Sequence, residues 1–131
     1  QDDGGLYLYT TRDGALQKIA SDVKEFAFSR DASMMAALEH KSLEVFSLGG
    51  KKEYWRFNLQ DVETARGLQW YKDGRHLFIM YPDEIRFLDL DDASQENFKA
   101  VAKTARAIYA PRENELYFLT DGKLFKLGFP E

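Results

Sequence analysis

The chain repeats itself at an interval of about forty residues, and this recurrence constrains its fold more than any other feature. The three repeated segments start at residues 23, 65 and 105. Aligned at offsets of 42 and 40 residues, they bring three positions into correspondence: Phe28, Trp70 and Ala110. Repeats of roughly 40–45 residues with strand-like content are typical of β-propeller blades. We therefore expect an all-β fold of about three blades, each a sheet of four antiparallel strands.

Each repeat has the same internal order of strands and turns. An alternating apolar strand is followed by a polar turn, a second strand, a short turn and a third strand. The expected second and third strands are 34–38 and 43–48, 77–81 and 85–90, and 116–120 and 124–127, and the expected fourth strands are 53–58 and 97–102. A short helix is an alternative only within residues 91–103.

The beginning of the chain continues the pattern out of phase. Residues 4–20 read as two strands around Asp13-Gly14, and they match the third and fourth strands of a blade. We therefore predict one propeller segment, 1–131. Its parts are a half blade at 1–21, blades at 22–62 and 63–103, and a partial blade at 104–131.

Composition excludes several classes of function. Hydrophobic residues make up 44% and aromatic residues 15% of the 131, which favours a folded globular chain. The net charge of −4 disfavours nucleic acid and anionic membrane as partners. There is no cysteine, so disulfides and thiolate chemistry are excluded. No apolar run approaches the ~18 residues needed to cross a bilayer, so we expect no direct membrane insertion.

The turns after the first strands carry a family resemblance. Phe28-Ser29-Arg30-Asp31, Trp70-Tyr71-Lys72-Asp73-Gly74 and the Pro111–Asn114 turn resemble the aromatic-Ser-Pro-Asp-Gly turn of TolB-like, WD-repeat-like bacterial propellers. Arg30 stands where that pattern has proline, and Asp89-Leu90 fits its later Asp-Leu pair. The resemblance covers nearly the whole chain and implies a propeller fold. The family includes periplasmic and cell-surface scaffolds and the propellers of some serine peptidases, so it also implies a location outside the cytoplasm.

The number of blades has a consequence for assembly. A propeller typically needs ~4–8 blades to close, and this chain offers about three. Either the sequence is a fragment of a larger propeller, or two copies pair into a ring of about six blades. In that ring, the strands at 6–10 and 15–20 would share a blade with the C-terminal strands, and one third strand would be surplus. An open or differently closed antiparallel β-fold is the alternative.

A candidate binding site comes from three basic residues at matching repeat positions: Lys24, Arg66 and Arg106. Because first strands are innermost in a propeller, these side chains would form a basic collar near one mouth of the channel. Such a collar could bind an acidic side chain, a carboxylate or a phosphate. Alternatively, each side chain extends to solvent or pairs with a nearby acid such as Glu25 or Glu63.

The remaining candidates favour structural roles. His40 and His76 occupy unlike repeat positions and are interpreted as surface turn residues. The acidic loop of Asp89, Asp91, Asp92 and Glu96 lacks the spacing of a calcium loop and is interpreted as a solvated turn. No serine lies in a Gly-x-Ser-x-Gly elbow. We expect Trp55 and Trp70 to pack between blades, and the fourth-strand aromatics Tyr54, Trp55 and Phe57 to pack against neighbours or to face a partner.

These observations favour a non-enzymatic scaffold for protein–protein interaction, with no cofactor and no metal. Two other functions remain open. One is the gating or substrate-recognition propeller of a serine peptidase whose catalytic domain lies outside this chain. The other is a small-ligand or carbohydrate receptor that uses the aromatic residues and the basic collar.

Overall fold

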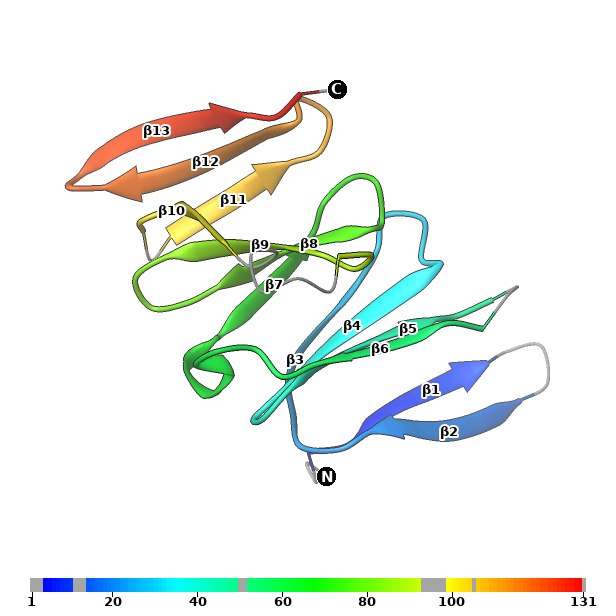
Figure 1. Cartoon of the computed structure of the whole chain (residues 1–131). Coiled ribbons are helices and arrows are strands. Elements are labelled where there is room, and N and C mark those ends of the chain that lie inside the picture. Colours follow the sequence, from blue (N-terminus) through cyan, green and yellow to red (C-terminus); the bar gives the residue numbers. More distant parts are fainter. Residues whose placement is uncertain (1–3, 11–13, 50–51, 93–98, 105, 131) are drawn as a thin grey trace.

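The computed structural model describes residues 4–10, 14–49, 52–92, 99–104 and 106–130, and it shows successive small antiparallel sheets (Figure 1). The N-terminal hairpin pairs β1 (Leu6–Thr10) with β2 (Ala15–Ala20). Blade 1 consists of β3 (Val23–Phe28), β4 (Met34–Glu39), β5 (Leu43–Ser47) and β6 (Tyr54–Phe57). Blade 2 follows the 3₁₀ turn η1 (Val62–Thr64) and consists of β7 (Gly67–Trp70), β8 (His76–Met80), β9 (Ile85–Asp89) and β10 (Lys99–Ala102). Blade 3 has β11 (Arg106–Ala110), β12 (Glu115–Thr120) and β13 (Lys123–Gly128).

Strand order within each sheet follows the chain, and every neighbouring pair is antiparallel. The predicted all-β class and the four-stranded antiparallel sheets are confirmed. The uncertain fourth strand of the second repeat is present as β10, although residues 97 and 98 lie outside the described residues. No α-helix occurs in the described part of 91–103, and residues 93–98 of that stretch are not described.

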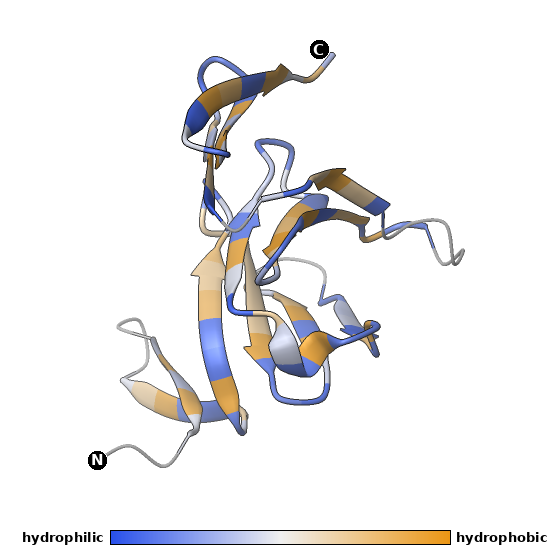
Figure 2. Cartoon of the chain, turned by 90° about the vertical axis from the view of Figure 1, so that its left-hand side faces the viewer, coloured by the Kyte–Doolittle hydropathy of each residue, from blue (hydrophilic) through white to orange (hydrophobic). Residues whose placement is uncertain are grey.

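The alternation of side chains along each strand gives every blade two faces, visible as alternating hydrophobic and hydrophilic bands in Figure 2. We call the face toward the following blade the forward face and the other the backward face. The forward face of blade 1 carries Ala36 and Leu38, and it packs on Trp70 and Ile79 of the backward face of blade 2. The forward face of blade 2 carries Phe78, which packs against blade 3. The core is therefore divided into two junctions between blades.

Strand register shows which positions of the three blades are equivalent. Phe28 lies opposite Met35, Trp70 opposite Leu77, and Tyr109 opposite Leu116. Tyr109, not Ala110, therefore corresponds to Phe28 and Trp70, which corrects the offset of the third repeat from 40 to 39 residues. A shift of one residue moves a side chain to the other face of its sheet. The sequence alignment thus assigned the residues of β11 to the wrong face.

The turn after β11 explains the error. In the first two repeats the residue with positive φ comes four positions after the reference aromatic: Ala32 (φ 61°) and Gly74 (φ 68°). In the third repeat it is Asn114 (φ 56°), five positions after Tyr109. Matching Asn114 to Gly74 aligns the turns and displaces the strands by one residue. The side chain of Asn114 accepts from the Tyr109 hydroxyl at 2.7 Å and donates to the carbonyl of Phe129 at 3.0 Å, so this turn also holds the last segment of the chain.

Candidate functional site

A polar cleft of about 630 Å³ lies between blade 1 and blade 2. Its walls are the turn between β3 and β4, the end of β5, Glu53, and the turn between β7 and β8. Charged groups of both signs line it: Arg30, Lys72 and Arg75, and Asp31, Glu53 and Asp73. We call this site the interblade cleft. It lies at the far ends of the first strands from the predicted basic collar, because Lys24 and Arg66 stand at the beginnings of those strands.

The turn from blade 1 is organised by Asp31. Its Oδ1 accepts hydrogen bonds from the Ser33 amide at 3.0 Å, the Ser33 hydroxyl at 2.7 Å and the Ser29 hydroxyl at 3.0 Å. These bonds, with Ser33 as the main donor, lower the pKa of Asp31 below its ordinary value. Arg30 is exposed and has no ion-pair partner within the described residues. Asp31 is therefore hydrogen-bonded within its own turn, whereas Arg30 lines the cleft.

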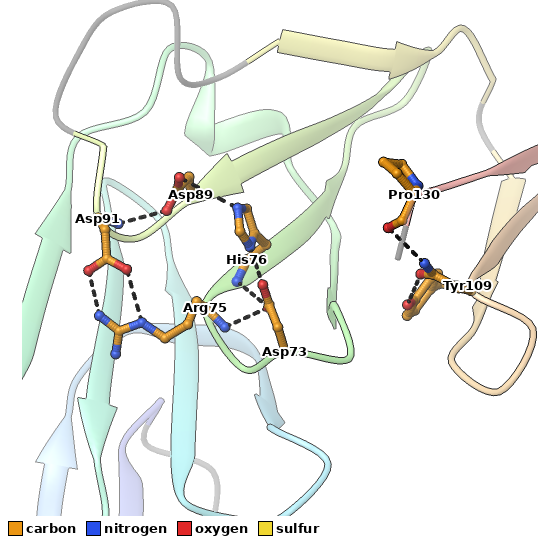
Figure 3. Close-up of polar contacts among 8 residues, drawn as sticks. Asp73, Arg75, His76, Asp89, Asp91, Tyr109 and Pro130 are labelled. Carbon is orange, nitrogen blue, oxygen red and sulfur yellow. Dashed lines mark hydrogen bonds and ion pairs between the residues drawn. The ribbon is translucent and has the colours of Figure 1, made fainter.

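The turn from blade 2 is organised in the same way by Asp73. Its Oδ1 accepts the amides of Arg75 at 2.8 Å and His76 at 3.1 Å, while Gly74 supplies the positive φ. The His76 ring stands between two carboxylates, with Nδ1 2.6 Å from Asp73 Oδ2 and Nε2 3.5 Å from Asp89 Oδ2 (Figure 3). It also stacks on Phe87 at 4.9 Å. His76 is therefore the first residue of β8 and part of a network, which corrects its interpretation as an isolated surface turn residue.

Arg75 ties the two blades together beneath the cleft. Its guanidinium forms a two-pronged contact with Asp91, shown in Figure 3, in which Nε donates to Asp91 Oδ2 at 3.0 Å. Its Nη1 lies 3.7 Å from Glu53 Oε1, and its Cζ lies 5.1 Å from the ring centroid of Trp55 in blade 1. The hydrogen bond from Arg75 lowers the pKa of Asp91. Paired in this way, Arg75, Glu53 and Asp91 hold the geometry of the cleft.

The predicted basic collar has three different environments in the structure. Lys24 Nζ donates to the carbonyls of Val62 at 3.1 Å, Glu63 at 3.2 Å and Ala65 at 2.7 Å, so it clamps blade 1 to the segment that leads into blade 2. Burial lowers the pKa of Lys24, while the charge of Glu63 opposes this effect. Arg66 is exposed and donates to the Pro82 carbonyl at 3.4 Å.

Arg106 does not share the position of the other two. It lies opposite Leu119, as Gly67 lies opposite Met80, so its equivalent in blade 2 is Gly67 rather than Arg66. Its side chain lines the forward face of blade 3 together with Ile108 and Leu124. The register thus breaks the equivalence on which the collar was predicted, although a ligand-binding role for these three residues remains a prediction.

The remaining candidate residues lie in turns or in the junction between blades 1 and 2. His40 is exposed in the turn after β4, as expected. Asp89, Asp91 and Asp92 belong to a turn in which Asp89 accepts the Asp91 amide at 2.9 Å, and Glu96 lies outside the described residues. Within the described residues, no group of His, Asp and Glu side chains could hold a metal ion. Trp70 is 5% exposed and donates to the Ala27 carbonyl at 2.8 Å, and Trp55 packs on the same junction, which confirms their predicted place between blades.

Sequence reasoning treated the residues of the interblade cleft as turn formers. The shared spacing of Asp31 and Asp73 within their repeats was the available signal, because the same turn in two neighbouring blades places the two turns side by side. The partners of Arg75 had no such signal, since Glu53 precedes β6 in blade 1 and Asp91 follows β9 in blade 2.

No protein-family model matches the chain, and no curated protein matches it by sequence. Two solved structures are similar over 95% of the chain. Hydrazine synthase of Kuenenia stuttgartiensis has a TM-score of 0.61 at 12% identity, and a candidate 6-phosphogluconolactonase of Bacteroides uniformis has 0.53 at 13%. The chain spans 51% and 47% of their lengths, which is about half.

At this identity the likeness concerns the fold alone and carries no activity. None of the helical segments in the described ranges has the length or the apolar character needed to span a bilayer. The repeated antiparallel sheets and their match to half of each larger chain lead to one conclusion: the chain is a partial β-propeller.

Proposed function

We propose that this chain is part of a TolB-like, WD-repeat-like propeller that serves as a non-enzymatic scaffold, and that its interblade cleft binds an acidic segment of a partner protein. The observation that carries the proposal is the distribution of charge in the cleft. Asp31 and Asp73 are satisfied by their own turns, and Glu53 faces Arg75. Arg30 remains without an ion-pair partner in the described residues, and Lys72 lines the same opening.

The shape of the cleft fits an extended peptide. Its walls are two turns held by internal hydrogen bonds, and Arg75 spans its base, so little conformational entropy is lost on binding. A carboxylate of the partner would form a charge-assisted contact with the Arg30 guanidinium, whose planar fork matches a carboxylate. The recognition would rest on shape and charge and would need no chemical step.

The family resemblance also supports a proposed location outside the cytoplasm, in the periplasm or at the cell surface. The peptidase-gating and small-ligand hypotheses remain predictions, because no contact or distance among the described residues favours either of them over protein binding.

The test is a binding assay with short extended peptides of acidic, neutral and basic composition, measured in solution by fluorescence anisotropy. Acidic peptides should bind, and the double variant R30E/K72E should weaken that binding by at least about tenfold, or roughly 1.4 kcal/mol. The matched control is K41E, which reverses a charge on the exposed turn between β4 and β5. Equal affinity for all three peptide classes, or unchanged binding by R30E/K72E, would refute the proposal.

A further inference from the structure

The guanidinium of Arg75, at the base of the interblade cleft, uses only one of its sides for hydrogen bonds. Asp91 binds the side formed by Nε and Nη2, and the third nitrogen, Nη1, points away from Asp91 (Figure 3). Nη1 lies 3.7 Å from Glu53 Oε1, which is too long for a hydrogen bond, and it makes no hydrogen bond within the described residues. The end of the guanidinium formed by Nη1 and Nη2 can therefore accept a second carboxylate.

Glu53 differs from the other two acids that line the cleft. Asp31 and Asp73 accept hydrogen bonds within their own turns, whereas the carboxylate of Glu53 accepts none from the described residues and its side chain is 36% exposed. The backbone of Glu53 is fixed, because its amide donates to the Ser47 hydroxyl at 2.7 Å and its carbonyl accepts from the Ser47 amide at 3.0 Å. The carboxylate can thus leave Arg75 by side-chain rotation alone, and an exposed ion pair of this kind contributes little stability.

Arg75 keeps its position when Glu53 moves away. Its two hydrogen bonds to Asp91 fix the orientation of the guanidinium, and its Cζ lies 5.1 Å from the ring centroid of Trp55. A carboxylate that enters the cleft therefore meets a guanidinium that is already oriented, so little conformational entropy is lost on binding. It can form two charge-assisted hydrogen bonds at the end where Glu53 forms none.

We propose that Glu53 is an internal competitor for Arg75, and that the ligand which displaces it is a segment with two acidic side chains. One carboxylate binds Arg30, in the turn from blade 1, and the other binds the Nη1–Nη2 end of Arg75, in the turn from blade 2. This inference rests on the proposed function of the cleft and adds to it the class of ligand and the residue that limits affinity.

The competition makes the cleft selective. A segment with a single acidic side chain can bind Arg30, but it leaves Glu53 on Arg75 and remains near that negative charge. A segment with two acidic side chains replaces the 3.7 Å contact with hydrogen bonds to Arg75, and Glu53 turns toward solvent. Specificity of this kind depends as much on repulsion of the wrong ligand as on attraction of the right one.

The test compares the wild type with E53Q, using extended peptides that carry two, one or no acidic side chains and measuring affinity by fluorescence anisotropy. The two-acid peptides form a series in which the distance between the acids varies. E53Q should raise the affinity for the best two-acid peptide by at least about threefold, within the range of an exposed ion pair, and should raise that for the one-acid peptide by less. The matched control is E113Q, which removes the same charge from the exposed turn between β11 and β12 and should change neither affinity.

A second background separates competition for Arg75 from a general effect of charge. In R75Q, with folding checked by circular dichroism, the additional substitution E53Q should no longer favour the two-acid peptide, because the group for which Glu53 competes is gone. If R75Q does not fold, the comparison of peptides in E53Q alone decides the question. An equal gain for one-acid and two-acid peptides, an equal gain with and without Arg75, or no gain in E53Q would each overturn the inference.

The outcome also distinguishes this inference from the proposed function. If acidic peptides bind the wild type and R30E/K72E weakens that binding while E53Q leaves it unchanged, the cleft binds acidic segments and only the role of Glu53 is wrong. If E53Q strengthens the binding of two-acid peptides while R30E/K72E has no effect, Glu53 does compete for Arg75, and Arg30 is not the anchor. If no acidic peptide binds the wild type or E53Q, both proposals are refuted.

Discussion

The junction between blades 1 and 2 and the junction between blades 2 and 3 use the same strand positions but fill them with different side chains. In the first, the forward face presents the small Ala36 and the aliphatic Val45. In the second, the equivalent positions hold Phe78 and Phe87. The first junction is mainly aliphatic around Trp70, whereas the second is a cluster of aromatic rings.

The residues that oppose these positions across each junction differ in the same sense. Ile79 of blade 2 lies in the first junction, and its equivalent in the second is Phe118. Ring centroids of Phe78 and Tyr109 lie 4.9 Å apart, and those of Tyr71 and Tyr109 lie 5.2 Å apart in a stacked arrangement. Each core cluster consists of residues from two neighbouring blades, so the junction, not the single blade, is the packing unit.

The largest expected effect comes from emptying the aromatic junction. Phe78 is fully buried, so F78A should lower the free energy of unfolding by about 3–5 kcal/mol through lost burial and a residual cavity. Both tryptophans of the chain, Trp55 and Trp70, lie in the first junction. Urea unfolding followed by tryptophan fluorescence and by circular dichroism should therefore separate, with the dichroism transition coming first.

L38A provides the matched control in the aliphatic junction. Leu38 is fully buried, and its loss should cost about 2–5 kcal/mol while the two probes continue to report one transition. A cost below about 1 kcal/mol for F78A would mean that the aromatic junction does not hold blade 3 in place.

An intermediate effect is expected from the hydrogen bonds that join the innermost strands. Gln69 makes two bonds to the Tyr109 backbone: its Nε2 donates to the carbonyl at 2.8 Å, and its Oε1 accepts from the amide at 3.1 Å. Trp70 makes one bond to blade 1, through the Ala27 carbonyl. Q69L should cost about 1–3 kcal/mol because it removes both side-chain hydrogen bonds to the Tyr109 backbone. W70F should lose about 1 kcal/mol from its missing hydrogen bond, beyond the change in packing.

Amide hydrogen exchange provides the readout for the Gln69 contact. In Q69L the Tyr109 amide should exchange faster than in the wild type, while protection in β4, inside blade 1, stays the same. If the Tyr109 amide keeps its protection, the side-chain bridge is not what joins these strands, and packing alone joins the two blades.

The sequence predicted the strands of all three blades, but it did not predict the register of β11 in blade 3 relative to the first strands of blades 1 and 2. Alternation and the Asp31 and Asp73 turns predicted the sheets of blades 1 and 2, because those turns place their left-handed residue at the same position. In blade 3 all four residues from Ala107 to Ala110 are apolar, so an alternation of apolar and polar residues could not show which side chains of β11 face which side of the sheet. The left-handed residue of the following turn, Asn114, comes one position later than in the other blades, and matching it to Gly74 shifted the alignment. Contacts between different blades, such as that of Arg75 with Glu53, leave no local pattern in the sequence and are seen only in the structure.

The backward face of blade 1 differs from that of blade 2 at two equivalent positions, one at the end of the second strand and one in the third. In blade 2 these positions hold Tyr81 and Arg86, and the Arg86 guanidinium carbon lies 4.2 Å from the Tyr81 ring centroid. Their equivalents in blade 1 are two acids, Glu39 and Glu44, both 8% exposed. Burial, reinforced by the neighbouring Glu44, raises the pKa of Glu39 to about 7. Burial would also raise the pKa of Glu44, but hydrogen bonds from Glu39, Tyr54 and Arg56 bring it below its ordinary value.

The pH dependence of this pair gives the smallest predicted effect. Below pH 4.5, which is the ordinary pKa of a glutamate, Glu39 is protonated in both the folded and the unfolded chain, so its raised pKa does not lower the stability. Between pH 4.5 and about 7 the unfolded chain releases the proton while the folded chain keeps it, so stability falls as the pH rises, and above about 7 the loss is constant.

E39Q tests this by replacing the shared proton with a permanent amide donor to Glu44. It should flatten the fall in stability between pH 4.5 and 7 and stabilise the protein by about 1 kcal/mol at pH 8, because solvent screening reduces the full effect of the shift.

E44Q is the control, and it should destabilise the protein because Arg56, 3.1 Å from Glu44 Oε1, loses its charged partner. Chemical denaturation across this pH range provides the measurement. If E39Q and the wild type lose stability in parallel as the pH rises, then the two carboxyls do not share a proton, and the backward face of blade 1 holds them as separate, solvated charges.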